Sequence, residues 1–229
     1  MPVMRPLWME FPADEKTFAM SDQWLVGSDL LVHPVVERGA TKADVYFPGA
    51  DGQLWYDVAS FKAIKAPRRL LVDAPIDHIP VYQRGGAIVP RKMRLRRASK
   101  LMVHDPYTLV VAPTADGAAS GELYLDDEHT YDYASEGKWK RVRFEYASGV
   151  LRASTTAEGD AGFDAANTVE RVVIAGVAEP PRAVTVQAAG EAPREISFVH
   201  DLARQVLTLR KPDVLVALEW TITLQAAEE

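Results

Sequence analysis

The chain contains 229 residues, of which 48% are hydrophobic and 25% charged, and it has 14 Gly, 15 Pro and no Cys. This composition is typical of a folded protein and excludes a wholly disordered or collagen-like chain. The net charge of −6 argues against general binding to nucleic acids or acidic membranes. No stretch approaches the ~20 apolar residues of a transmembrane helix. The absence of Cys removes disulfides, thiol nucleophiles and thiolate metal ligands.

Residues 1–25 form an unusual opening segment because apolar side chains crowd a stretch that also contains Pro2, Pro6 and Pro12. One interpretation is an N-terminal strand that docks into the following domain. The other is a strand that is normally buried in a larger domain and leaves an apolar patch here. The only helix that we expect also lies in this region, over residues 11–22, with Asp14 at its N-cap.

From Leu30 onward the sequence predicts short strands separated by turns that are rich in Gly, Pro and Asp. Period-2 alternation is clearest over residues 141–146, where charged and apolar side chains take opposite faces. The expected strands cover residues 30–36, 45–47, 54–56, 70–72, 79–82, 87–89, 107–112, 121–125, 141–146, 150–155, 170–175, 184–187, 195–199, 205–209 and 218–224. The pattern predicts an all-β protein with two β-sandwich domains rather than alternating βαβ units.

A boundary between the two sets of strands is expected at residues 91–100, which follow Pro90 and carry six basic side chains in ten positions. Alternation puts Lys92, Arg94 and Arg96 on one side of an extended segment. No aromatic residue lies among them to stack on a base, so we expect local ion pairs rather than nucleic-acid binding.

Acidic residues cluster at Asp126, Asp127 and Glu128. On a strand, the Cα atoms of Asp126 and Glu128 would lie ~6.5–7 Å apart on one face, a spacing that is compatible with a pair of glycosidase carboxyl groups. The favoured interpretation is a solvated or turn-forming cluster. A calcium site that uses Asp126, Asp127 and Glu128 is the alternative, because hard cations prefer oxygen ligands.

The other chemistry-bearing residues give no catalytic pattern. The five His residues are scattered, and His33 lies in an apolar run typical of a hydrogen-bonded core histidine. The sequence contains neither a Gly-x-Ser-x-Gly motif nor a phosphate-binding glycine loop. Six aromatic residues could form a surface on which sugars stack, although such residues more often fill cores. They are Trp55, Tyr56, Tyr124, Tyr131, Tyr133 and Trp139.

Several long motifs resemble the C-terminal part of glycoside hydrolase family 31, and the subgroup that they resemble most is that of the glucosidase II alpha (catalytic) subunits. The motifs are Arg5-Pro6-Leu7-Trp8, Asp22-Gln23-Trp24-Leu25-Val26-Gly27, Leu30-Leu31-Val32-His33-Pro34-Val35, Trp55-Tyr56-Asp57, Arg84-Gly85-Gly86-Ala87-Ile88-Val89-Pro90 and Leu125-Asp126-Asp127. The resemblance covers nearly the whole chain.

The resemblance implies that residues 1–25 are the end of a catalytic (β/α)₈ barrel, including its last strand. Residues 26–98 would form a proximal β-domain, and residues 99–229 a distal β-sandwich domain. Both catalytic aspartates of the family lie upstream of the Arg5-Pro6-Leu7 motif, in Trp-x-Asp-Met-Asn-Glu and Trp-x-Gly-Asp patterns that follow no Trp of this chain. We therefore expect no catalytic residue here, and the chain alone to be inactive. Arg5 is the one candidate for substrate contact, although a structural ion pair is favoured.

The resemblance further implies a parent enzyme that is a retaining exo-α-glucosidase and removes α-linked glucose from N-glycans without a cofactor. Its implied partners are the missing barrel, the glucosidase II beta subunit and the glucosylated glycan, with no nucleic acid and no membrane. The endoplasmic reticulum lumen is the implied location, and residues 1–6 do not have the pattern of a signal peptide. Two alternatives stay open: a stand-alone carbohydrate-binding β-sandwich, and the tail of another family-31 α-glucosidase or α-xylosidase.

Overall fold

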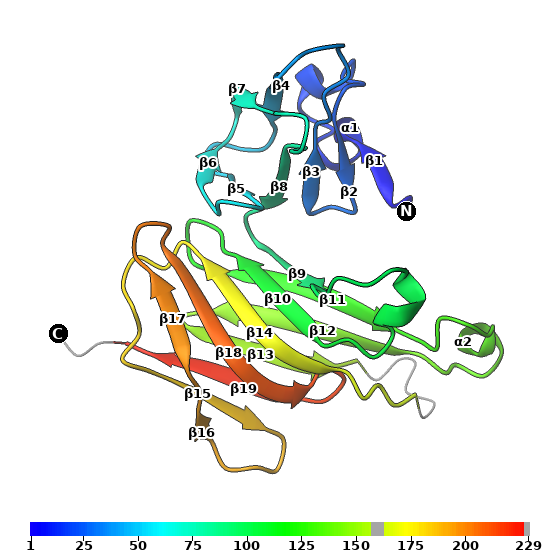
Figure 1. Cartoon of the computed structure of the whole chain (residues 1–229), viewed down its shortest axis with the longest axis vertical. Coiled ribbons are helices and arrows are strands. Elements are labelled where there is room, and N and C mark those ends of the chain that lie inside the picture. Colours follow the sequence, from blue (N-terminus) through cyan, green and yellow to red (C-terminus); the bar gives the residue numbers. More distant parts are fainter. Residues whose placement is uncertain (157–162, 227–229) are drawn as a thin grey trace. The chain divides into compact units, whose positions relative to one another are not determined.

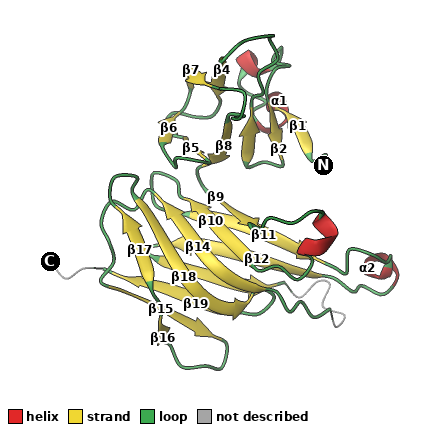
Figure 2. Cartoon of the chain, viewed as in Figure 1, coloured by secondary structure: helices red, strands yellow, loops and turns green. Residues whose placement is uncertain are grey.

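The computed structural model describes residues 1–156 and 163–226, which form β-strands with a few short helices (Figures 1 and 2). The chain divides into two compact units. The first consists of Met1–Ala87 with Thr114–Asp116, and the second of Ile88–Pro113 with Gly117–Glu229. The all-β class predicted from the strand pattern is confirmed.

The first unit contains a six-stranded sheet in the order β1-β2-β3-β8-β5-β6 and a separate two-stranded sheet, β4-β7. Its elements are β1 (Met4–Pro6), α1 (Leu7–Glu10), the 3₁₀ helix η1 (Glu15–Thr17), β2 (Trp24–Val26), β3 (Leu30–Val32), β4 (Lys42–Phe47), β5 (Leu54–Asp57), β6 (Ala63–Lys65), β7 (Arg68–Asp73) and β8 (Val81–Arg84). All pairings within the two sheets are antiparallel.

The opening segment is docked in the first unit. Strand β1 pairs antiparallel with β2, so that Arg5 lies opposite Leu25. Leu7 and Leu25 are fully buried and Phe11 nearly so, in one core with Trp55 and other residues of β3–β8. For the inward side chains, the interpretation of an N-terminal strand that docks into the following domain is therefore confirmed. On the outer side, however, large apolar side chains remain exposed: Met1, Val3, Met4, Trp8, Phe18 and Val26.

Buried polar groups fix the position of this segment. The amide of Gln23, which is 2% exposed, donates from Nε2 to the carbonyl of Tyr46 at 2.7 Å. Its Oε1 accepts from the backbone N–H of Tyr46 at 2.9 Å. The same tyrosine donates its hydroxyl to Asp14 at 2.7 Å, and burial together with this hydrogen bond raises the pKa of Tyr46 to about 12. Residues 14–23 are thus tied to β4 by three hydrogen bonds.

The second unit is built on one eleven-stranded sheet in the order β16-β15-β19-β13-β12-β11-β9-β10-β14-β18-β17. Its elements are β9 (Ala87–Arg91), the 3₁₀ helix η2 (Ser99–Met102), β10 (Tyr107–Ala112), β11 (Ala119–Leu125), α2 (Asp132–Ser135), β12 (Lys140–Ala147), β13 (Val150–Thr155), β14 (Thr168–Ala175), β15 (Ala183–Ala188), β16 (Arg194–Glu195), β17 (Phe198–Asp201), β18 (Val206–Leu215) and β19 (Trp220–Gln225). Side chains from both halves of the sheet, such as Phe144 and Leu209, share one core. The two expected sandwich layers therefore belong to a single curled sheet.

Most predicted strands are confirmed, and β10 and β13 begin and end at the predicted residues. The strand expected over residues 195–199 is divided between β16 and β17. The prediction of a helix over residues 11–22 is wrong, because only the short 3₁₀ helix η1 forms there. Asp14 is its N-cap, as predicted. The strand β6 and the short helices α1, η2 and α2 lie where no such element was predicted.

The basic segment 91–100 lies within the second unit, as does the predicted domain boundary between residues 98 and 99. Arg94 pairs with Glu170 at 3.0 Å, and Arg96 with Asp105 at 2.6 Å, so the expected local use of these charges is confirmed. Among the described residues, no helix has the length and apolar character needed to cross a membrane.

Candidate functional site

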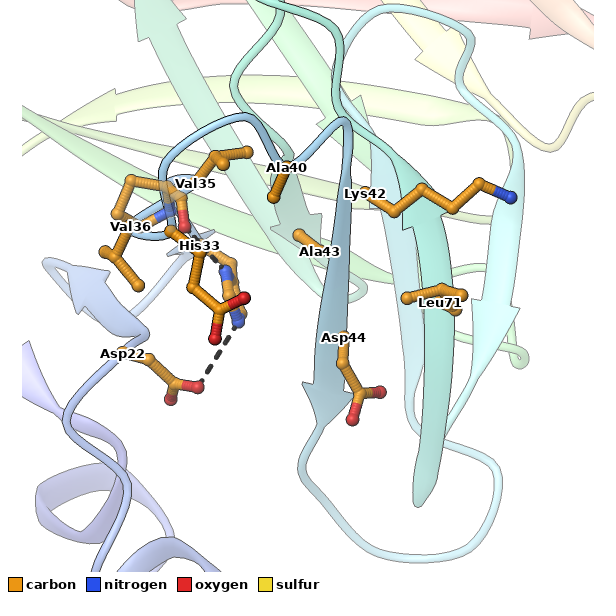
Figure 3. Close-up of a pocket in the computed structure, with 11 residues that line it drawn as sticks. Asp22, His33, Val35, Val36, Ala40, Lys42, Ala43, Asp44 and Leu71 are labelled. Atoms are coloured by element: carbon orange, nitrogen blue, oxygen red, sulfur yellow. Dashed lines mark hydrogen bonds and ion pairs between the residues drawn. The ribbon is translucent and has the colours of Figure 1, made fainter.

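A pocket of about 250 Å³ in the first unit surrounds His33, at the end of β3 (Figure 3). Charged side chains from three segments line it: Asp22 before β2, Glu37 after β3, and Lys42 and Asp44 on β4. The rest of the lining is mostly apolar and includes Val35, Val36 and Leu71. The pocket therefore combines one buried imidazole with three carboxylates and one amine.

The hydrogen bonds of His33 define its tautomer. Nδ1 lies 3.0 Å from the carbonyl oxygen of Pro34, which can only accept, so Nδ1 carries a proton. Nε2 lies 3.5 Å from Oδ2 of Asp22 and has no hydrogen-bond partner in the structure. The imidazole side chain is 7% exposed, whereas that of Asp22 is 48% exposed. His33 is thus a hydrogen-bonded core histidine, as expected, and its Nε2 faces the carboxylate of Asp22.

Arg5 lies on β1 in a local charge network. Its Nη1 donates to Oε1 of Glu10 at 2.7 Å, and its Nε donates to the carbonyl of Pro2 at 2.8 Å. Arg84 approaches the other carboxylate oxygen of Glu10 at 3.9 Å and stacks over the ring of Phe11 at 4.8 Å. These contacts hold the guanidinium of Arg5 in a structural ion pair with α1.

The acidic cluster after β11 forms a turn. Oδ1 of Asp127 accepts from the backbone N–H groups of His129 and Thr130, both at 3.0 Å, and Oδ2 accepts from the hydroxyl of Thr130 at 2.7 Å. These hydrogen bonds lower the pKa of Asp127 to about 2. Asp126 accepts from the N–H of Glu128 at 2.9 Å, and Glu128 itself has a left-handed backbone with φ of 58°. Over the described part of the chain, no group of three His, Asp or Glu residues is placed to hold a metal ion.

The same cluster borders a larger pocket of about 570 Å³ in the second unit. Lys92 lies at this pocket, donates to the carbonyl of Val103 at 3.2 Å and approaches Glu128 at 3.7 Å. Its ammonium also lies over the ring of Tyr107, 5.1 Å from the centroid. The turn-forming interpretation of the acidic residues is confirmed, since Asp126 and Asp127 accept hydrogen bonds from their own loop and Glu128 pairs with Lys92.

The six aromatic residues separate into two groups. Trp55 and Tyr56 are buried in the first unit, at 0% and 4% exposure, and cannot reach a ligand. The other four lie around the loop between β11 and β12, where Tyr124 stacks on Trp139 with ring centroids 5.6 Å apart. Tyr131 and Tyr133 form a second pair at 6.2 Å. The sequence alone did not separate these groups, because residue type does not distinguish a buried aromatic side chain from an exposed one.

Comparisons with known proteins agree with this architecture. The model of the glycosyl hydrolase family 31 C-terminal domain matches residues 1–89. Neutral alpha-glucosidase AB from Homo sapiens is 45% identical over 224 residues, which are 98% of this chain and 23% of the relative. The probable glucan 1,3-alpha-glucosidase from Arabidopsis thaliana is 38% identical over 230 residues, covering 97% of this chain and 25% of the relative.

Solved structures give the same result. The catalytic subunit in the crystal structure of an ER glucosidase II heterodimeric complex, which also contains the binding domain of the regulatory subunit, matches with a TM-score of 0.89 and 27% identity. The match covers 98% of this chain and 26% of that chain. A dextranase from Flavobacterium johnsoniae matches with a TM-score of 0.78 and 25% identity, over 98% of this chain and 29% of that one.

The fold and the matched relatives thus define a β-domain portion of a glycoside hydrolase. The chain belongs to glycoside hydrolase family 31, and it corresponds to the C-terminal part of this family. It spans about a quarter of the length of the curated relatives that it matches.

Proposed function

We propose that this chain is the non-catalytic C-terminal portion of a retaining exo-α-glucosidase that resembles the glucosidase II alpha subunit and removes α-linked glucose from N-glycans. The observation that carries the proposal is the 45% identity to human neutral alpha-glucosidase AB over 98% of this chain. In this assignment, the unit that begins at Met1 and extends to Ala87 is the proximal domain, and the unit that begins at Ile88 is the distal domain. The parent protein works in the lumen of the endoplasmic reticulum with a regulatory beta subunit.

The exposed side of the opening segment supports this role. Trp8 and Phe18 are 46% and 56% exposed and line a shallow pocket with Pro12. Met4 on β1 is 60% exposed and Val26 on β2 is 37% exposed. Exposed apolar clusters of this kind usually mark contact surfaces. We assign this surface to the barrel, which the chain supports from one side.

The contacts of the candidate carboxylates support the proposal that this chain alone is inactive. The glycosidase mechanism requires two carboxyl groups that face one glycosidic bond. Here Asp127 is engaged in a turn, and Glu10 is paired with Arg5. We expect the purified chain to show no turnover of an aryl α-glucoside. Turnover that is abolished by Asp126→Asn would assign catalysis to the acidic cluster and refute the proposal.

Fragment complementation tests the supporting role directly. The remaining part of human neutral alpha-glucosidase AB, without the segment that matches this chain, is co-expressed with this chain and assayed on an aryl α-glucoside. We expect activity only when both pieces are present. The positive control is the same piece with the human segment. Restoration by the human segment but not by this chain would count against the assignment.

A stand-alone carbohydrate-binding β-sandwich is the second candidate. The exposed aromatic side chains around the loop between β11 and β12 favour sugar contact. The apolar opening segment and the match of residues 1–89 to an enzyme domain favour the first proposal. The complementation assay distinguishes the two candidate functions, because an independent sugar-binding module is not expected to restore glucosidase activity.

A further inference from the structure

Four aromatic side chains form an exposed surface on the second unit, which we call the aromatic platform: Tyr124, Tyr131, Tyr133 and Trp139. The three tyrosines are 46%, 79% and 41% exposed, and Trp139 is half-buried. The platform lies where the loop that contains α2 joins β11 and β12 (Figure 1). A group of exposed large aromatic side chains is a candidate contact surface.

The strand register explains why these rings lie together. Tyr124 of β11 is directly opposite Arg141 of β12. Trp139 directly precedes β12, and its ring stacks on that of Tyr124. The rings of Tyr124 and Trp139 are 5.6 Å apart and inclined by only 27°, and Arg141 lies over the Trp139 ring at 5.6 Å. The two rings thus stack on one another, and Arg141 lies against the ring of Trp139.

The second pair adjoins the first. Tyr131 precedes α2 and Tyr133 lies within it, with their rings inclined by 42°. Partial burial, a hydrogen bond to Asp126 and the nearby phenol of Tyr133 raise the pKa of Tyr124. The backbone of the loop is held by the hydrogen bonds of Asp127 and by those of α2 to Tyr131.

Polar groups surround the rings. Lys138 is bound by Asp132 at 3.1 Å and by Glu136 at 2.6 Å, and Arg141 approaches Glu122 at 4.0 Å. Donors and acceptors are therefore both present at the rim, with their charges largely paired. Among described residues 103–156, every large hydrophobic side chain that is exposed is a tyrosine. A rim with paired charges and no aliphatic side chain favours an uncharged ligand that has both apolar and hydroxyl-bearing faces.

We infer that the aromatic platform binds the pyranose rings of an uncharged oligosaccharide. The C–H face of a pyranose packs on Tyr124 and on Tyr131 or Tyr133, while the hydroxyl groups exchange hydrogen bonds with Asp126, Asp132 and Arg141. All its residues lie in the second unit. The choice of an α-glucan as the probe rests on the proposed function.

The test is a titration of the whole 229-residue chain with maltoheptaose, followed by ¹H–¹⁵N NMR, with cellohexaose as the comparison sugar. We expect shifts at residues 122–141 and saturable binding. Tyr124→Ala is expected to weaken binding about tenfold, since it removes one stacking ring, whereas Tyr124→Phe keeps the ring and most of the affinity. Trp8→Ala is the matched control, because Trp8 is an equally exposed ring in the first unit.

Each result has a defined meaning. No shift with either sugar at 10 mM, about the weakest affinity expected of a stacking surface, would overturn the inference. Binding that Tyr124→Ala and Tyr131→Ala leave unchanged would also overturn it, because the sugar would then bind elsewhere. If the chain dimerises and Tyr131→Ser abolishes the dimer without any sugar binding, the occupant is a second copy and the inference is wrong. Binding to maltoheptaose can succeed even if the complementation assay fails, so the two proposals are tested independently.

Discussion

The guanidinium of Arg96 donates two hydrogen bonds to the carboxylate of Asp105, from Nε to Oδ2 at 3.0 Å and from Nη2 to Oδ1 at 2.6 Å. This parallel, two-bond geometry is the strongest form of a carboxylate–guanidinium pair. The side chain of Asp105 is only 4% exposed, so the pair anchors the basic segment 91–100 to the chain before β10. Asn167 completes the anchor by donating to the carbonyl of Asp105 at 2.9 Å.

The Arg96–Asp105 pair predicts a pH dependence of stability. Because Arg96 holds the pKa of Asp105 below its ordinary value, the ionised carboxylate stabilises the fold above pH ~4, and this contribution is lost as the pH falls through the lowered pKa. Urea unfolding at pH 7 and pH 3 measures the effect. We expect the parent chain to lose more stability between these values than Asp105→Asn does. An equal loss in both would contradict the assignment, and the exposed Asp51→Asn is the control.

Leu7 and Trp8 are neighbours with opposite environments, and this difference predicts opposite consequences. Leu7 is fully buried, so Leu7→Ala should reduce the free energy of unfolding by about 2–5 kcal/mol. Trp8 is 46% exposed, so Trp8→Ala should change stability by less than about 0.5 kcal/mol and reduce self-association instead. Denaturant unfolding and light scattering provide the two readouts. Similar stability losses in both variants would show that the opening segment is not docked as the structure has it.

Gln23 satisfies two backbone groups of Tyr46 that would otherwise be buried without partners. Gln23→Ala should therefore cost about 2–4 kcal/mol, since an unsatisfied buried polar group costs roughly 1–3 kcal/mol. Gln187→Ala is the matched control, because its one hydrogen bond, to the carbonyl of Glu191 at 3.1 Å, is exposed. Denaturant unfolding of the two variants measures the difference. Equal effects would mean that water replaces Gln23 at β4.

Gly121 allows β11 to approach β9 closely. A Cβ at this position would overlap the carbonyl group of Ile88, which is backbone and cannot move aside by a rotamer change. Gly121→Ala should therefore destabilise the second unit by about 1–3 kcal/mol or more. The neighbouring Ser120→Ala, on an exposed position of the same strand, should be nearly neutral. A Gly121→Ala variant with unchanged thermal unfolding would contradict the close approach of these strands.

Sequence reasoning found the strands where alternation was long and turns were marked by Gly or Pro, as in β10 and β13. It missed β6, because three residues are too few to show a period. The strand predicted here ended at Leu209, whereas β18 continues to Leu215. Its second half contains Lys211 and Asp213, which have φ values of 48° and 47°. Such positive φ values are rare for residues other than Gly, and no sequence pattern marks them.

The local roles of the candidate residues were predictable, whereas their long-range partners were not. The turn at Asp127 follows from an Asp three residues before a Thr, which is a familiar hydrogen-bonding pattern. The pairing of Arg94 with Glu170, in contrast, joins residues far apart in sequence and depends on the sheet topology. The pocket around His33 likewise depends on β3 and β4, which belong to different sheets and come together only in the folded unit.

Strand β9 has a consequence for how the second unit can be produced. It is the first strand of this unit along the chain, yet it lies between β11 and β10 in the interior of the eleven-stranded sheet. A recombinant piece that starts at residue 99 would lack it and would leave two sheet fragments with newly unpaired edges. Such edges pair readily with other chains, so that piece should precipitate. A piece that starts before Ala87 retains the strand, and expression trials for structural or binding work on this unit should begin there.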